Sequence, residues 1–157
     1  MQTLEGQWEI KMRIRSGIIL IEDDKLALIE RHRAGLHYFT FPGGGVDKGE
    51  SPEQAAIREA EEELGIQVEI KQKVADVHFG ERPQYYFLAK RFGGEFGTGT
   101  GEEYGEFNPV HGSYQPLWMS LEDVKNKNVV PRELADLVVR FAQEGWPSEP
   151  VIIIEKK

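Results

Sequence analysis

Residues 44–66 read GGVDKGESPEQAAIREAEEELGI, and this stretch contains the strongest helix signal in the chain. Ser51 can cap a helix, because its hydroxyl accepts a hydrogen bond from the free amides of the first turn. The proline that follows suits the first helical position, since it has no amide to satisfy. Gln54 stands where a capping box needs its partner, and Gly65 can close the helix in the left-handed conformation. The pattern predicts a helix over residues 52–64.

The two faces of this predicted helix differ in chemistry. One face carries small or apolar residues at i, i+4 and i+8, and a further apolar residue lies next to the first of them; this spacing suits close packing against a sheet. These residues are Ala56, Ala60, Leu64 and Ile57. Glu59, Glu62 and Glu63 are spaced i, i+3 and i+4, so they share a face roughly opposite to that stripe. Like charges at this spacing repel by about 0.2–0.5 kcal/mol per pair, so the cluster requires compensation.

The acidic face has two interpretations. It is either a solvated surface, which is the usual state of a glutamate cluster, or a site for a hard divalent cation such as Mg²⁺, which prefers oxygen ligands. The segment before the helix favours the second interpretation, because Gly43, Gly44 and Gly45 leave backbone amides open to close approach by a ligand. A bound cation would also bridge to substrate phosphates and offset their charge.

Outside this stretch, strand and helix patterns alternate along the chain. Residues 12–30 read as two strands joined by a charged turn, residues 67–77 as a further strand, and Pro131 opens a second amphipathic helix. This interleaving predicts an α/β sandwich. With no repeat and no linker rich in proline and serine, we expect one domain over residues 1–157. The apolar tail 151–154 fits either an edge strand or a contact with a partner.

Composition and charge exclude several classes of function. The chain has 157 residues, no cysteine and a formal charge of −8. The lack of cysteine rules out disulfides, thiolate zinc sites and cysteine nucleophiles. Residues 47–63 carry seven acids and two bases, and residues 95–106 carry four acids and no base. Because a polyanion needs a basic face to bind, this charge argues against a nucleic-acid polymer as partner and for a small phosphate-rich substrate that binds through a metal.

The apolar segments also bear on the compartment. The longest ones, residues 17–21 and 151–154, are far shorter than the roughly 20 residues that a membrane span requires. The first twenty residues carry scattered charges and do not resemble a signal peptide. We therefore expect a cytoplasmic protein with no membrane partner.

Residues 44–66 also match a known motif in which glycine, glutamate and arginine stand at defined positions. Gly44 is followed after five residues by Glu50, and after seven more by the run REAEEELGI, which begins at Arg58. This pattern resembles the Nudix box, the signature of the Nudix (MutT-type) hydrolases, with all seven fixed positions matched. Ala60 is a mild departure, because it is only small where the pattern asks for an apolar residue. The resemblance implies a Nudix-type α/β/α sandwich with a mixed β-sheet between helices.

The resemblance also implies a reaction and a set of site residues. Nudix hydrolases cleave a nucleoside diphosphate linked to another group, by attack of water on a phosphorus of the pyrophosphate, and they require divalent cations. The implied cofactor is Mg²⁺, with Mn²⁺ as the alternative, held by Glu59, Glu62, Glu63 and the carbonyl of Gly44. One of these glutamates, or one outside the box, would be the general base. Arg58 would orient a box glutamate by a charge-assisted bond.

Further residues are candidates for contact with the substrate. They are Arg31, Arg33, Gly43, Gly45, Glu102 and Glu103. The two arginines are predicted to lie in a loop, where they either contact phosphates or form an exposed basic turn. The two glutamates lie in a glycine-rich loop, which is either a lid that supplies an extra carboxylate or a solvated surface. The histidines, at positions 32, 37, 78 and 111, show no ligand spacing, so the sequence argues against a histidine zinc site.

The leading hypothesis is therefore a metal-dependent pyrophosphohydrolase that acts on a small nucleotide or nucleotide derivative, as a monomer or a homodimer. A nucleotide-binding or sensing domain without turnover is the alternative, although such domains usually lose box glutamates and this chain keeps them all. A purely structural acidic domain is a third possibility. The sequence does not determine which nucleotide derivative is the substrate.

Overall fold

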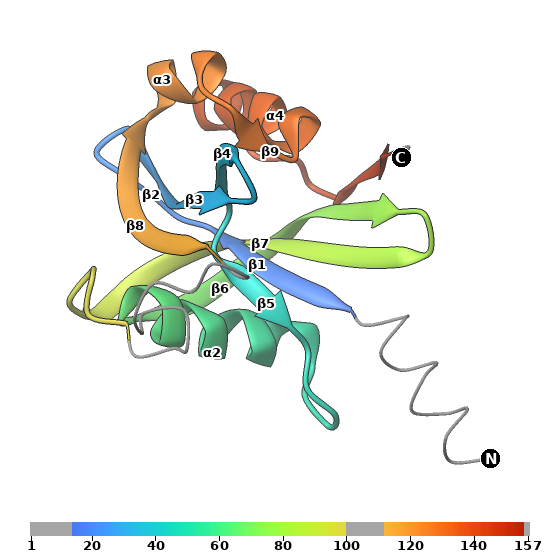
Figure 1. Ribbon diagram of the computed structural model, residues 1–157. Helices are drawn as coiled ribbons and strands as arrows, with labels where there is room; N and C mark the ends of the chain where they lie inside the picture. The colour runs from blue at the N-terminus through green and yellow to red at the C-terminus, as the bar shows by residue number, and fades with distance from the viewer. Residues whose placement is uncertain (1–13, 100–111, 156–157) are drawn as a thin grey trace.

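The computed structural model describes residues 14–99 and 112–155, which form a layered arrangement of strands and helices (Figure 1). The elements in chain order are β1 (Arg15–Ile19), β2 (Ile21–Glu22), β3 (Lys25–Arg33), β4 (Leu36–Thr40), β5 (Gly43–Gly45), α2 (Pro52–Leu64), β6 (Ile66–Phe79), β7 (Arg82–Gly94), β8 (Ser113–Ser120), α3 (Leu121–Asn126), β9 (Val129–Val130), α4 (Arg132–Glu144) and β10 (Val151–Glu155). The α/β class expected from the sequence is confirmed.

The strands divide between two sheets. One has the order β10-β6-β7-β1-β5, and the other has the order β2-β3-β4-β9 with β8 paired to β3. The first sheet is mixed, because β1 runs parallel to β7 and β10 runs parallel to β6, whereas β6 and β7 are antiparallel. The β1–β5 pair is also antiparallel, and it places the glycines of β5 beside residues 15–17.

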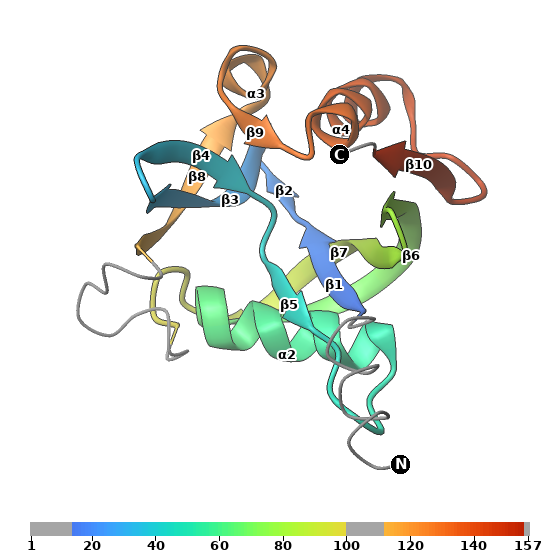
Figure 2. The ribbon, with the colours of Figure 1, turned by 45° about the vertical axis from the view of Figure 1, so that its right-hand side comes forward.

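Helices lie on both sides of the strands, as the sandwich prediction requires. In both ribbon views α2 lies along one side, below β1 and β5, and α3 and α4 lie on the other (Figure 2). The apolar run in β1 serves both layers: Ile18 belongs to the core cluster that includes the α2 residue Ala60, and Ile19 belongs to the cluster that includes the α4 residue Val138. A strand buried on both faces reads as a continuous apolar run rather than an alternating one.

Helix α2 has the predicted bounds and caps. The Ser51 hydroxyl accepts from the Gln54 amide at 3.1 Å, and the Gln54 side chain accepts from the Ser51 amide at 2.9 Å. Gly65 ends the helix at φ 77°, in the left-handed region. The buried stripe differs slightly from the expectation: Ala55 is buried, whereas Ile57 is 40% exposed.

Two sequence expectations about the strands need correction. Residues 31–33 were expected in a loop, but they extend β3, and the chain turns only at Ala34 and Gly35, which have φ of 52° and 79°. The charged turn at residues 22–25 joins β2 to β3, while β1 pairs with β5 and β7 instead. Both differences arise from strand pairing: β3 is extended by its pairing with β4 and β8, and β1 is placed by its pairing with β5 and β7.

The tail is an edge strand, since β10 pairs with β6 alone in the sheet order. No helix among residues 14–99 and 112–155 is long and apolar enough to cross a membrane.

Candidate active site

The glycine strand β5 is packed so closely that side chains would not fit. A Cβ on Gly43 would meet the carbonyl oxygen of Ser16 and lie 2.7 Å from Cα of Gly17, both of them backbone atoms of β1. A Cβ on Gly44 would instead overlap the carboxylate of Glu59. The glycines therefore let β5 pair with β1 on one side and receive a carboxylate of α2 on the other. The sequence predicted close approach of a ligand to these glycines, which stays a prediction; the structure shows β1 backbone close to Gly43 and the Glu59 carboxylate close to Gly44.

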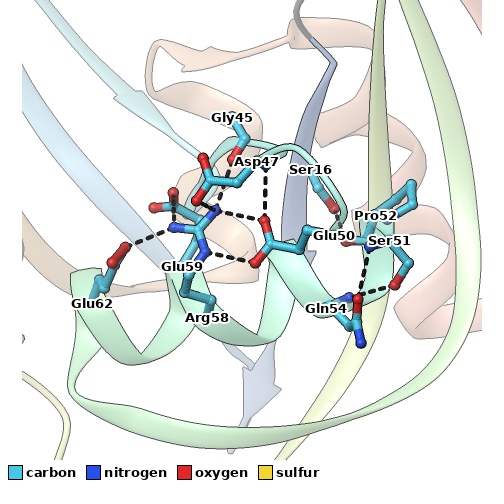
Figure 3. A network of polar contacts seen from close by, with 10 residues as sticks. All are labelled: Ser16, Gly45, Asp47, Glu50, Ser51, Pro52, Gln54, Arg58, Glu59 and Glu62. Carbon is cyan, nitrogen blue, oxygen red and sulfur yellow. Dashed lines mark hydrogen bonds and ion pairs between the residues drawn. The ribbon is translucent and has the colours of Figure 1, made fainter.

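Arg58 is the centre of the polar network on α2 (Figure 3). Its Nε and Nη2 atoms donate to the two carboxylate oxygens of Glu50, at 2.8 and 3.0 Å. Its Nη1 atom donates to both Glu59 and Glu62, at 2.9 Å each, and Nη2 also donates to the Gly45 carbonyl at 2.8 Å. One guanidinium thus joins the loop before the helix to two of the carboxylates on its acidic face, which provides the compensation that the cluster needs.

The network changes the acidity of its members. The hydrogen bonds from Arg58 lower the pKa of Glu50 below its ordinary value, and the Asp47 amide, which donates to the same carboxylate at 2.9 Å, adds to the effect. The same pairing with Glu50 raises the pKa of Arg58. Both groups therefore stay charged over a wider pH range than they would in an unfolded chain.

The three predicted metal ligands differ in exposure and in partners. Glu63 is buried, and its Oε1 accepts from the Gly43 amide at 2.6 Å. The side chain of Glu59 is 13% exposed, and that of Glu62 is 44% exposed. All three line one cavity together with Gly44. The carboxylate and carbonyl oxygens of this set are the ligands that Mg²⁺ prefers, so the residues present fit a hard divalent cation.

The oxygens of these three carboxylates are not close enough together in the structure to bind one ion. Among residues 14–99 and 112–155, the group of three metal-ligating side chains with ligand atoms within 4.8 Å of one another lies elsewhere, at Glu30, His32 and His37. Glu59 and Glu62 share the Nη1 atom of Arg58 instead. Binding of all three carboxylates to one ion therefore requires a side-chain rotation, which is easiest for the half-exposed Glu62.

The cavity that holds the carboxylates has a basic wall. Its volume is about 640 Å³, and it combines the acidic face of α2 with arginines from three strands. These arginines are Arg15 on β1, Arg31 and Arg33 on β3, and Arg82 on β7. Gln84 and Tyr114 line the same cavity. An acidic end beside a basic wall suits a substrate whose phosphates contact a cation at one end and guanidinium groups along their length.

Arg31 is fixed in place within this wall. It is only 8% exposed, its guanidinium lies 3.6 Å from the ring centroid of Tyr114, and its Nε donates to the Ser113 carbonyl at 3.3 Å. The ring of Tyr38 lies on another side, 5.9 Å away. Stacking on an aromatic face holds a planar guanidinium in one orientation.

A second cavity continues from the first. Its volume is about 520 Å³, and it shares Arg15, Arg31, Arg33 and Gln84 with the first cavity. Tyr38 and the buried Tyr86 add aromatic surface to it. Burial raises the pKa of Tyr86 to about 12, so its hydroxyl stays protonated and donates to Gln84 at 2.6 Å. The two cavities are neighbours that share three arginines and Gln84, and their linings together include acidic, basic and aromatic residues.

The structure brings most of the predicted site residues together. The residues that line the first cavity are Arg31, Arg33, Gly43, Gly44, Gly45, Arg58, Glu59, Glu62 and Glu63. Glu102 and Glu103 lie outside the described residues. Sequence reasoning missed Arg15, Arg82, Gln84 and Tyr114, which enter the site because β1 pairs with both β5 and β7 and because β8 pairs with β3. No local motif marks these positions, since each is an ordinary strand residue until the strand order is known.

The comparison with family models decides which family the chain represents. The model of the NUDIX domain matches residues 11–138. The chain belongs to the NUDIX family. The matched range contains the box, the glycine strand and the strands that carry the arginines. One NUDIX domain over residues 1–157 stays a prediction, because the match ends at residue 138.

Curated relatives of this NUDIX chain resemble it over a limited stretch. It is 44% identical over 59 residues to the 8-oxo-dGTP diphosphatase of Escherichia coli, an alignment that covers 36% of this chain and 45% of that protein. It is 47% identical over 53 residues to the RNA pyrophosphohydrolase of Aeromonas hydrophila, which covers 34% of this chain and 30% of that protein. The chain therefore spans less than half the length of either relative.

Solved structures share the fold of this NUDIX chain over most of its length. A NUDIX hydrolase from Nitrosomonas europaea superposes with a TM-score of 0.69 and 22% identity, over 91% of this chain and 79% of that one. An ADP-ribose pyrophosphatase from Streptococcus suis gives a TM-score of 0.65 and 20% identity, over 90% of this chain and 98% of that one. These similarities confirm the Nudix-type fold.

Proposed function

We propose that this protein hydrolyses a pyrophosphate bond in a nucleoside diphosphate linked to another group, by attack of water on phosphorus, with Mg²⁺ or Mn²⁺ as cofactor. The observation that carries the proposal is the cavity that Glu59, Glu62 and Glu63 line together with arginines of three strands. A solvated acidic surface would not require arginines from distant strands in the same cavity.

The arginines of the cavity would bind the phosphates of the substrate. Arg15, Arg31, Arg33 and Arg82 would bind phosphate oxygens by charge-assisted hydrogen bonds and orient the pyrophosphate. Arg31 is the best placed of them, because its stacking on Tyr114 fixes the guanidinium before a ligand arrives. The group attached to the diphosphate would extend into the second cavity, past the shared arginines toward Tyr38.

The cofactor would be held by Glu59, Glu62, Glu63 and the Gly44 carbonyl. A divalent cation bound there supplies charge neutralisation of the phosphates and a lower pKa for a bound water. The chain's own residues would set up that chemistry: Arg58 positions Glu59 and Glu62, and the Gly43 amide positions Glu63. One of these carboxylates, or one outside the box, would take the proton of the attacking water.

The experiment that tests this proposal is a hydrolysis assay on a panel of candidate substrates, chosen from the relatives and from the residues that line the site. It contains nucleoside triphosphates, 8-oxo-dGTP, ADP-ribose, nucleotide sugars, dinucleoside polyphosphates and RNA with a 5′-triphosphate, each with Mg²⁺ and with Mn²⁺. Relatives named as acting on 8-oxo-dGTP and on RNA justify testing a small nucleotide beside a polymer end. Analysis of the released phosphate, pyrophosphate or monophosphate identifies the bond that is cut. The charge of the chain leads us to expect a small nucleotide as the better substrate.

The controls are variants of the acidic face. Glu62→Gln and Glu63→Gln should lower kcat by roughly 10²–10⁴ on the best substrate while the circular dichroism spectrum stays unchanged. Near-normal turnover by both variants would contradict the assignment of the site. Nucleotide binding without turnover of any substrate in the panel would instead support the binding or sensing domain.

A further inference from the structure

Three metal-ligating side chains meet on the β3–β4 hairpin, outside the proposed active site. Glu30 and His32 are two residues apart on β3, so their side chains lie on the same face of the strand. His37 on β4 is the register partner of His32 in the antiparallel pair. Arg31 and Arg33 line the active-site cavity, so the alternate residues Glu30 and His32 face the other side of the sheet.

The distances within this group are close to those of a metal centre. Oε2 of Glu30 lies 2.6 Å from Nε2 of His37 and 3.5 Å from Nε2 of His32. All three ligand atoms lie within 4.8 Å of one another. In a tetrahedral zinc site with bonds of 2.0–2.1 Å, neighbouring ligand atoms are about 3.3 Å apart. The 2.6 Å contact is a hydrogen bond in this structure, so an ion would replace it and the imidazole rings would rotate about their own side-chain bonds to bind.

Aromatic rings contact the two imidazoles, which stay open to solvent. The two imidazoles are stacked, with centroids 4.2 Å apart and planes within 9° of parallel, and the ring of Phe39 contacts His37 at 5.2 Å. The side chains of His32 and His37 are 57% and 51% exposed. Because pairing of β3 with β4 already places the ligands, binding an ion would cost little conformational entropy.

We propose that Glu30, His32 and His37 form a second metal site, selective for Zn²⁺ and similar borderline ions, with water in the fourth position. Two imidazoles and one carboxylate suit zinc, whereas the oxygen ligands of the box suit Mg²⁺. The sequence did not reveal this site, because His32 and His37 come together only across the hairpin. A bound ion would join β3 to β4 behind the arginines of the cavity. This site stands independently of the proposed reaction.

The first experiment is a calorimetric titration of the full chain with ZnCl₂, with excess Mg²⁺ present to occupy the box. We expect saturable binding of Zn²⁺ at the hairpin and a loss of affinity of at least about tenfold in His32→Asn, His37→Asn and Glu30→Gln. His78→Asn is the matched control, since His78 lies on β6 and outside the group, and this variant should bind like the wild type. Urea denaturation without zinc verifies that each variant is folded.

Two outcomes would overturn the proposal. One is equal Zn²⁺ binding by the wild type and by the His32→Asn/His37→Asn double variant. The other is Zn²⁺ binding that Glu62→Gln abolishes and the double variant retains, which would place zinc in the box. Nuclear magnetic resonance of ¹⁵N-labelled imidazoles gives an independent reading: Zn²⁺ should shift the signals of His32 and His37 and leave that of His78 in place. No shift of the first two would also refute the site.

Discussion

The role of Arg58 leads to the sharpest prediction about stability. Arg58→Met keeps most of the side-chain volume and removes the guanidinium that bonds Glu50, Glu59 and Glu62. The side chain of Glu50 is only 16% exposed, so its carboxylate loses its arginine in a place that solvent reaches poorly. Removal of one partner from a buried ion pair costs about 3–5 kcal/mol.

Two features reduce that figure. Arg58 is itself 28% exposed, and Glu62 is 44% exposed, so water replaces part of what is lost. Several hydrogen bonds to one guanidinium are also not additive. We therefore expect the free energy of unfolding to fall by about 2–4 kcal/mol, a large share of the 5–15 kcal/mol typical of a domain. With a urea dependence of about 2 kcal/mol per molar, the unfolding midpoint should fall by about 1–2 M.

Arg91→Met is the matched control for this measurement. Arg91 is 32% exposed and forms one ion pair, with Glu22 at 2.7 Å, far from the box in the sequence. Because a single pair near the surface is worth about 0–1 kcal/mol, this variant should unfold close to the wild type. Urea titrations followed by circular dichroism measure both variants. A loss in Arg58→Met no larger than that in Arg91→Met would refute the role of Arg58 as the centre of the network.

Three further predictions concern single positions. Gly44→Ala should keep the fold but lower turnover at least about tenfold, because its Cβ displaces the Glu59 carboxylate. Gly43→Ala should instead lower the urea midpoint, because its Cβ meets backbone atoms of β1. Equal effects of the two variants on stability would contradict this prediction. The pKa of Glu50 is lowered in the folded protein, so its charged carboxylate stabilises the fold above about pH 4.5, and this stabilisation is lost as the carboxylate is protonated. Glu50→Gln should therefore lose less stability than the wild type as the pH falls below about 4.5. Urea midpoints measured from neutral to acid pH test this, and an equal pH dependence of the two proteins would count against it. The pKa of Tyr86 is about 12 in the folded protein, so between pH 10 and 12 this tyrosine ionises in the unfolded chain first, and the wild type should lose about 2–3 kcal/mol of free energy of unfolding. Tyr86→Phe should not show this loss. The same dependence of stability on pH in the two proteins over this range would rule the prediction out.

The sequence predicted the parts of the site that depend on local geometry. Positions i, i+3 and i+4 of a helix share a face whatever the rest of the chain does, so Glu59, Glu62 and Glu63 were placed correctly on one side of α2. The caps at Ser51 and Gly65 were also predicted, because capping bonds join residues within one turn. The glycine run led us to expect close approach of a ligand, and that stays a prediction. Only the structure identifies β1 as the neighbour of Gly43 and Glu59 as that of Gly44.

The basic wall could not be predicted in the same way. Arg15 and Arg82 stand far apart in the chain, and they line one cavity because β1 pairs in parallel with β7. The setting of Arg31 was predicted wrongly: it was expected in a loop, and it lies instead on a strand, buried against Tyr114. Its contact with substrate stays a prediction. The aromatic ring comes from β8, which follows β3 in the chain by some eighty residues and pairs with it directly.

By itself, then, the sequence determined the helix, its caps, the shared acidic face and the resemblance to the Nudix box, because each depends on contacts between residues close in the chain. Tertiary structure alone decided which strands meet. It therefore decided which arginines line the cavity of the carboxylates, since β1, β3 and β7 bring them there from distant parts of the chain. The physical reason is that strand pairing is selected by the burial of whole faces, a property that no short segment contains.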